Sequence, residues 1–189
     1  MDLVIRPTLA GMQKEGTNYV GFLYAGLMIM PDGTPKVIEF NCRMGDPETQ
    51  PIMMRLQSDL VEICKATVDG TLAAQSAKWD SRSSLGVVLA AGGYPEAYAR
   101  GKVIDGLDNA DSGSQKVFHA GTAADGEDIV TNGGRVICVV GLGDTVAAAA
   151  ATAYDAADRV TWEDGHFRRD IGHRAIARER NRARRDNQH

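Results

Sequence analysis

The sequence predicts an α+β fold, in which antiparallel strands and helices alternate along two consecutive blocks. In the first block, a turn-forming Pro-Asp-Gly-Thr-Pro segment separates two strand-like apolar runs, at 20–30 and 36–41. Apolar residues then recur at helical spacing over 52–64. In the second block, short strand-like runs between 84 and 140 precede an alanine-rich segment.

The composition is that of an ordinary soluble protein, with 189 residues of which 43% are hydrophobic and 24% charged. No segment approaches the ~20 consecutive apolar residues that span a bilayer, so no membrane partner is expected. Asp2, Arg6 and Pro7 interrupt any apolar stretch at the N-terminus, which argues against a signal peptide. The three cysteines are odd in number and form no CxxC pair, so we expect a reduced, cytoplasmic protein.

The net charge of −4 argues against a nucleic-acid partner. Arginine is concentrated between 168 and 185, where a basic segment could bind phosphates. Acidic residues, however, interrupt this segment at Asp170 and Glu179, and no aromatic residue follows Phe167. We therefore interpret it as a solvated terminal helix.

The helical stripe of the first block consists of Ile52, Met53, Leu56, Leu60, Ile63 and Cys64. Gly70 marks its expected end, because glycine readily adopts the left-handed conformation that follows many helices.

The second block is expected to begin near Ser83, after a boundary at 79–84. Its predicted strands are 84–91, 116–121, 128–131 and 135–140. Turn-forming residues follow the first of them at 92–95 and precede the last at 132–134. Asp144 is expected to cap an alanine-rich helix that runs to about Asp158, because its carboxylate can accept from the first free amides.

The most informative residues for function lie in the strand-like run Val-Ile-Glu-Phe-Asn at 37–41. Alternate side chains of a strand share a face, so Glu39 and Asn41 point the same way while Ile38 and Phe40 point into the opposite layer. A carboxylate and a carboxamide on one face suit Mg²⁺, which prefers oxygen ligands and is often shared with substrate phosphates. Taken alone, the pair is a weak signal, and a solvated strand face is the simpler explanation.

The residues after this strand strengthen the functional interpretation. Arg43 supplies a planar fork of donors suited to phosphate or carboxylate. Gly45 permits close backbone approach, and Asp46 and Glu48 add two carboxylates where the strand gives way to a helix. The alternative is that Asp46 and Glu48 only stabilise the N-terminus of the helix that begins near Pro51.

The run VIEFNCRMGDPETQP at 37–51 closely resembles the signature of the glycinamide ribonucleotide synthetases (phosphoribosylamine–glycine ligases), which are ATP-grasp enzymes of purine biosynthesis. Five further segments are similar to the same family and follow its order: GFLYAGL at 21–27, AAGGYP at 90–95, VFHAGT at 117–122, TNGGRV at 131–136 and RRDIGHRAI at 168–176. The resemblance covers the chain to about Arg180.

The resemblance implies the C-terminal part of an ATP-grasp domain at 1–80, the family's small β-rich C-terminal domain at 83–180, and a charged tail at 181–189. It also implies ATP-dependent ligation of glycine to 5-phosphoribosylamine through an acyl phosphate. Glu39 and Asn41 would hold Mg²⁺ or Mn²⁺ at the ATP phosphates, and Arg43 would neutralise the transferring phosphoryl group. Asp46 would act with Arg43 in catalysis, and Asp46 and Glu48 would orient the amine substrate.

The same resemblance places Met1 deep inside the ATP-grasp domain, so the missing N-terminal portion of the enzyme is an expected partner and the chain alone is expected to be inactive. No carboxylate occurs at 20–30, which leaves two protein ligands for the metal. His119 is expected to be structural, whereas Arg135 either reaches a substrate or lies on the strand surface. The alternatives are another ATP-grasp ligase or carboxylase, and a non-catalytic assembly module.

Overall fold

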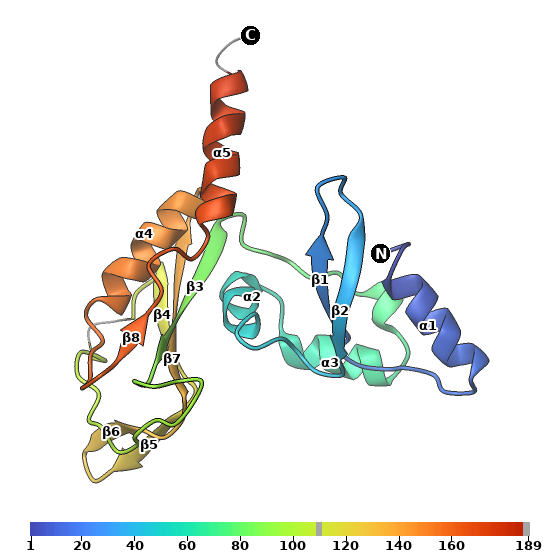
Figure 1. The fold of residues 1–189 in the computed structure, drawn as a ribbon. Coiled ribbons are helices and arrows are strands. Elements are labelled where there is room, and N and C mark those ends of the chain that lie inside the picture. Colours follow the sequence, from blue (N-terminus) through green and yellow to red (C-terminus); the bar gives the residue numbers. More distant parts are fainter. Residues whose placement is uncertain (109–110, 187–189) are drawn as a thin grey trace. The chain divides into compact units, whose positions relative to one another are not determined.

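The computed structural model describes residues 1–108 and 111–186, and the chain divides into two compact units (Figure 1). The first unit combines Met1–Asp46 with Gln57–Lys78, and the second combines Pro47–Leu56 with the chain from Trp79 onward. Residues 187–189 of the expected charged tail lie outside the described residues. No helix in the described part of the chain has the length and apolar character needed to cross a membrane.

The first unit contains a two-stranded antiparallel hairpin and two α-helices. Its elements are α1 (Ile5–Lys14), β1 (Tyr24–Ile29), β2 (Pro35–Asn41), α3 (Leu60–Val68) and the short 3₁₀ helix η1 (Leu72–Ala74). The predicted turn between the two strands is confirmed. Asp32 accepts a hydrogen bond from the backbone N–H of Thr34 (2.9 Å), and Gly33 has a positive φ of 86°.

The predicted helical stripe is interrupted, so one helix becomes two. α2 (Thr49–Arg55) ends before Leu56, which adopts an extended conformation and forms a β-bridge with Trp79. α3 starts afresh because Asp59 caps it, accepting from the amide of Val61 at 2.8 Å. The helical spacing of the apolar residues does not indicate this break, because the spacing continues across the capping aspartate.

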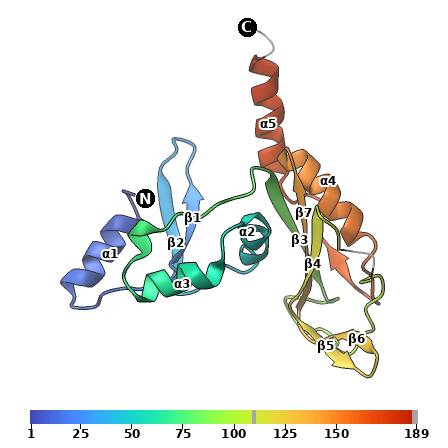
Figure 2. The same cartoon turned by 180° about the vertical axis from the view of Figure 1, so that it is seen from behind.

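The second unit is built on a four-stranded antiparallel sheet in the order β4-β7-β3-β8. The strands are β3 (Ser83–Ala90), β4 (Gln115–His119), β7 (Arg135–Gly143) and β8 (His166–Phe167). A separate hairpin pairs β5 (Thr122–Asp125) with β6 (Asp128–Thr131). Figure 2 shows this hairpin at the end of the sheet remote from the C-terminal helix α5 (His173–Asp186). The sequence did not predict β5 or β8.

One face of this sheet forms the core with α4 (Val146–Ala157). Leu85, Val87 and Leu89 alternate along β3 toward the buried alanines of the helix. The helix lies unusually close to β7, because a Cβ added to Gly141 would meet the carbonyl oxygen of Ala149 at 2.4 Å. Small residues on both elements therefore determine their spacing.

The opposite face of the sheet carries α2. A Cβ added to Gly86 would lie 3.0 Å from Pro51 Cγ, and the Ser84 hydroxyl donates to the Pro51 carbonyl at 2.9 Å. Arg55 secures the end of α2 by donating from Nη2 to the carbonyl of Asp80 at 2.9 Å. α2, which the sequence groups with the first block, thus packs on the sheet of the second.

The N-terminus of α4 is capped differently from the prediction. Thr145, not Asp144, is the N-cap residue, and its hydroxyl accepts from the amide of Ala148 at 3.1 Å. Glu179 of α5 accepts from the amide of Val146 at 2.9 Å. A carboxylate from a distant helix therefore satisfies a donor that the prediction assigned to Asp144. The expected C-terminal helix is present as α5.

Candidate metal and phosphate site

Glu39 and Asn41 lie in the last half of β2, opposite Gly26 and Tyr24 of β1. The register shifts between Gly26 and Leu27, so Ile38 is an extra residue on β2. Pairing is regular from Glu39 to Asn41, and the two side chains therefore share a face, as predicted from the alternation.

Gly26 leaves room for the carboxylate of Glu39. A Cβ placed on Gly26 would lie 3.0 Å from Glu39 Cγ and 3.6 Å from Glu39 Oε1. The glutamate side chain therefore extends over the backbone of β1 at the position where that strand lacks a side chain. Glu39 is exposed to solvent and Asn41 is partly exposed, so a ligand can reach both.

This pair of donors fits a hard divalent cation. Among the described residues, no group of three His, Cys, Asp or Glu side chains is placed to hold a metal ion. A cation at Glu39 and Asn41 would therefore complete its shell with water and phosphate oxygens, which is the usual arrangement for Mg²⁺. The donor set suits a metal that binds together with a phosphorylated substrate.

Arg43 follows β2 by two residues and is exposed. Its Nη1 donates to the carbonyl oxygen of Met44 at 2.9 Å, which fixes one edge of the guanidinium. Because a guanidinium carries five N–H donors, the group retains donors for a phosphate.

The two carboxylates after Gly45 divide between the units. Gly45 is buried and Asp46 is the last residue of the first segment of the first unit. Glu48 belongs to the second unit, where it is the N-cap residue of α2 and makes no side-chain capping hydrogen bond. The structure thus groups Glu39, Asn41, Arg43 and Asp46 in one unit. Glu48 lies at the start of α2, where its charge can also stabilise the N-terminus of the helix, as the alternative requires.

Tyr19 is a neighbour of the motif that the sequence analysis missed. Its hydroxyl donates to the carbonyl of Phe22. Partial desolvation, followed by the adjacent Cys42 thiol, raises the pKa of Tyr19 above its usual range. The tyrosine therefore lies beside the motif between Asn41 and Arg43, a proximity that no local sequence pattern indicates.

His119, which the sequence predicts to be structural, lies at the exposed end of β4. Its Nδ1 is 3.1 Å from the Thr122 hydroxyl, across the turn into β5. Arg135 opens β7, where its carbonyl accepts from the amide of Gly121 at 3.0 Å.

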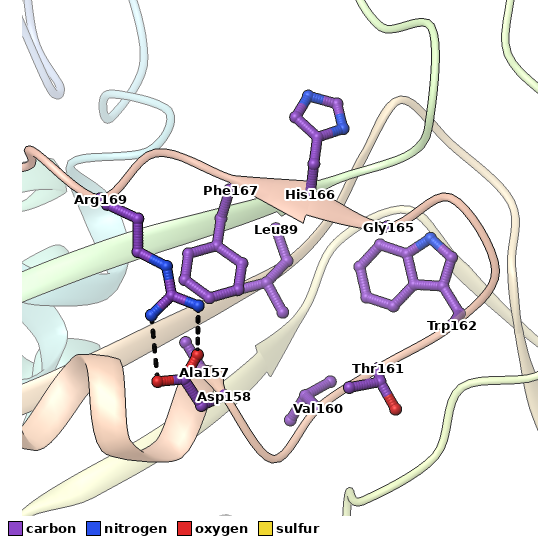
Figure 3. Close-up of a pocket in the computed structure, with 10 residues that line it drawn as sticks. All are labelled: Leu89, Ala157, Asp158, Val160, Thr161, Trp162, Gly165, His166, Phe167 and Arg169. Atoms are coloured by element: carbon purple, nitrogen blue, oxygen red, sulfur yellow. Dashed lines mark hydrogen bonds and ion pairs between the residues drawn. The ribbon is translucent and has the colours of Figure 1, made fainter.

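A cavity of about 220 Å³ lies between β8 and the end of α4 (Figure 3). Phe167 and Leu89 point into it, whereas His166 projects from the other side of β8. Arg169 stacks on Phe167, with its guanidinium carbon 4.4 Å from the ring centroid, and forms a two-point ion pair with Asp158. This pair lowers the pKa of Asp158, chiefly through its hydrogen bonds. Both charges are therefore engaged with each other, which indicates a structural contact.

Two family models match the chain. The ATP-grasp (A) domain of phosphoribosylglycinamide synthetase matches residues 1–49, and the C domain of the same enzyme matches residues 84–174. The phosphoribosylamine–glycine ligase of Allochromatium vinosum is 63% identical over 177 residues, which are 94% of this chain and 41% of that protein. The Vibrio cholerae ligase is 62% identical over 176 residues, or 93% of this chain and 41% of that protein.

Two solved structures are similar to this chain. The phosphoribosylamine–glycine ligase of Thermotoga maritima is similar with a TM-score of 0.73 and 38% identity, over 87% of this chain and 40% of that one. The biotin carboxylase domain of Hydrogenobacter thermophilus 2-oxoglutarate carboxylase, solved with MgADP, ADP and bicarbonate, has a TM-score of 0.57 and 14% identity. This second likeness covers 82% of the chain and 34% of that structure, and it concerns the fold alone.

Proposed function

Because the chain belongs to the phosphoribosylamine–glycine ligase family and spans about 41% of the length of its relatives, we propose that it is the metal- and phosphate-binding part of an ATP-dependent carbon–nitrogen ligase. The complete enzyme joins glycine to 5-phosphoribosylamine and yields glycinamide ribonucleotide, ADP and phosphate. This reaction belongs to purine biosynthesis. The observation that carries the proposal is the Glu39–Asn41 pair on one face of β2, inside a segment that the family's ATP-grasp domain matches.

Each residue of the motif has a distinct role in this proposal. Glu39 and Asn41 hold Mg²⁺ or Mn²⁺, which when bound neutralises charge on the ATP phosphates. Arg43 binds oxygens of the transferring phosphoryl group with the donors that its contact to Met44 leaves available. Asp46 acts beside Arg43, and Asp46 and Glu48 orient the amine of phosphoribosylamine. Positioning and charge stabilisation supply most of what such a reaction requires of the protein.

The β1–β2 hairpin supports a further part of the proposal, namely that the rest of the ligase covers this unit. Three of its apolar side chains are more than half exposed: Met28 at 53%, Ile29 at 59% and Ile38 at 66%. Large apolar side chains gathered on one small hairpin mark it as a surface that a partner can cover. The occupant we propose is the part of the ligase that lies outside the region matched here, because the relatives are more than twice as long as the match.

The three cysteines, all among the described residues, form no disulfide, and Cys42 is exposed while Cys138 is buried. We propose a cytoplasmic location, where thiols remain reduced and purine precursors are made.

A chimera tests the proposed function. The chain replaces the matched region of the Allochromatium vinosum ligase, and formation of ADP is measured with glycine and phosphoribosylamine present or omitted. We expect ADP formation that requires both substrates in the chimera and none from the chain alone. A folded chimera that fails to ligate would contradict the proposed reaction, and turnover by the chain alone would contradict the need for the remainder. ADP formation that requires bicarbonate in place of glycine would identify a carboxylase.

A further inference from the structure

A second cavity, of about 290 Å³, lies on the second unit and gathers basic side chains from two separate segments, the start of β7 and residues 166–168. Its lining contains two guanidinium groups and one imidazole, together with a phenol ring, but no carboxylate. The lining residues are Val88, Ala90, Tyr94, Arg135, His166, Phe167 and Arg168. An arrangement of this kind attracts a small anion with an apolar or sugar-like body.

The backbone holds the basic residues firmly in place. Arg135 and His166 both pair with Ala90, from the two sides of β3. The carbonyl of Arg168 accepts from the Tyr154 hydroxyl at 2.9 Å. A site whose side chains start from paired strands is organised before the ligand arrives, which favours binding.

Glycine makes room for the aromatic wall of the cavity. A Cβ on Gly134 would lie 2.2 Å from Cδ2 of Tyr94, so the ring rests directly on the backbone that leads into Arg135. The turn that precedes β7 therefore brings an aromatic face and a guanidinium together. Arg135, which the sequence places either at a substrate or on the strand surface, lines this cavity.

Arg168 also forms an ion pair with Asp170, through Nε at 2.8 Å and Nη2 at 2.6 Å. This pair orients the guanidinium and raises its pKa. It engages two of the five N–H donors, so the remaining donors can serve an anion.

The cavity shares a sheet face with α2. Gly86 contacts Pro51 of that helix, and Val88 and Ala90 follow on the same side of β3, because alternate residues share a face. Val88 lies only about 7 Å along the strand from Gly86. The helix that carries Glu48 at its start and the basic cavity thus occupy one face of one sheet.

We propose that this cavity is the subsite for the phosphate of the phosphorylated pentose substrate. Arg135 and Arg168 bind the phosphate oxygens, His166 adds a third donor, and the Tyr94 ring packs against the sugar. The inference rests on the proposed function, in which Glu48 orients the amine at the other end of the same substrate.

Binding of ribose 5-phosphate to the ¹⁵N-labelled 189-residue chain tests the subsite without any need for catalysis. We expect saturable shifts of the Gly134, His166 and Arg168 amide signals in the millimolar range, with none for ribose. Arg135→Ala should weaken binding at least about tenfold, because it removes charge-assisted hydrogen bonds. Arg180→Ala, on the exposed side of α5, should leave it unchanged. Absence of saturable shifts, equal binding of inorganic phosphate, or an unaffected Arg135→Ala chain would overturn the assignment.

The chimera separates this inference from the proposed function. Arg135→Ala should raise KM for phosphoribosylamine and leave KM for glycine unchanged. An unchanged KM for phosphoribosylamine in an active chimera would refute the subsite alone. If the chimera fails to ligate while the chain still binds ribose 5-phosphate, the proposed function is refuted. The cavity would then remain a site for a phosphate ester.

Discussion

Gly26 lies opposite Glu39 across the β1–β2 hairpin, and a Cβ at Gly26 would approach Glu39 Cγ to 3.0 Å. The glycine thus determines where the carboxylate lies. Glu39 is a flexible side chain, so the contact can be relieved by a rotation that moves the carboxylate and leaves the strand pairing intact.

Gly26→Ala should therefore disturb metal use more than stability. In the chimera, we expect a several-fold rise in the Mg²⁺ concentration needed for half-maximal ligation. The thermal midpoint should change by only a few degrees. Gly11→Ala is the matched control, because no atom lies within 4 Å of the added Cβ at that helical position. An unaltered Mg²⁺ requirement for Gly26→Ala would show that Glu39 does not depend on this contact.

Arg43→Lys should lower kcat of the chimera about tenfold or more, because an ammonium cannot reproduce the planar fork that binds two phosphate oxygens. KM for phosphoribosylamine should change little. Arg178→Lys, on the exposed surface of α5, is the control for loss of a guanidinium. Equal kcat values for the two variants would remove Arg43 from the phosphate site.

Gly141→Ala tests the close packing of α4 on β7. The added Cβ would lie 2.4 Å from the Ala149 carbonyl and 2.5 Å from the Ala153 amide nitrogen, and neither backbone group can turn away. We expect a loss of about 1–3 kcal/mol in the free energy of unfolding. Gly113→Ala, with open space around the new Cβ, should lose far less.

Urea unfolding followed by tryptophan fluorescence measures this loss for the correct unit. Both tryptophans of the chain, Trp79 and Trp162, belong to the second unit. A midpoint for Gly141→Ala equal to that of Gly113→Ala would contradict the observed helix–strand distance.

Asp80 gives the second unit a pH-dependent contribution to stability. Hydrogen bonds from Arg82, followed by its charge, lower the pKa of Asp80 to about 2. Because the folded-state pKa lies below the usual value of ~3.9, the Asp80 carboxylate contributes its full stabilisation at pH values above ~3.9. This stabilisation is lost as the pH falls through the folded-state pKa. Asp80→Asn should therefore lower the thermal midpoint at pH 7, and the difference from the unsubstituted chain should shrink toward pH 2.

Asp2→Asn is the comparison for this prediction. It breaks an ion pair with Arg6 whose side chains are 82% and 76% exposed, and such exposed pairs contribute little. A pH-independent difference for Asp80→Asn would exclude the Asp80–Arg82 pair as its cause.

Much of the fold follows from local patterns in the sequence. The hairpin turn, the second-unit strands β3, β4, β6 and β7, and the alanine-rich helix were all predicted near their observed positions. Two predictions were wrong: a single helix over 52–64, and Asp144 as the cap of α4. Each depends on a partner that the local pattern does not contain. Leu56 leaves the helix to pair with Trp79, and the α4 amides are satisfied by Thr145 and Glu179.

The candidate site, like the fold, could be predicted from the sequence only in part. Alternation along a strand predicts that Glu39 and Asn41 share a face, because that depends on one strand only. The basic cavity was not predicted, because His166 and Arg135 meet at Ala90 through pairing between strands distant in sequence. The short strand β8 has only two residues and carries no periodic signal.

The central claim is that Glu39 and Asn41 hold the metal of an ATP-dependent ligase. Ligation by the chimera with Glu39→Gln tests it most directly, with Glu62→Gln as the control, since Glu62 pairs with Lys65 on the exposed side of α3. We expect Glu39→Gln to lose at least about tenfold in ligation rate at limiting Mg²⁺, because a neutral amide binds a hard cation more weakly than a carboxylate does. The Glu62→Gln chimera should match the unsubstituted one. Equal rates and equal Mg²⁺ dependence for all three chimeras would contradict the claim.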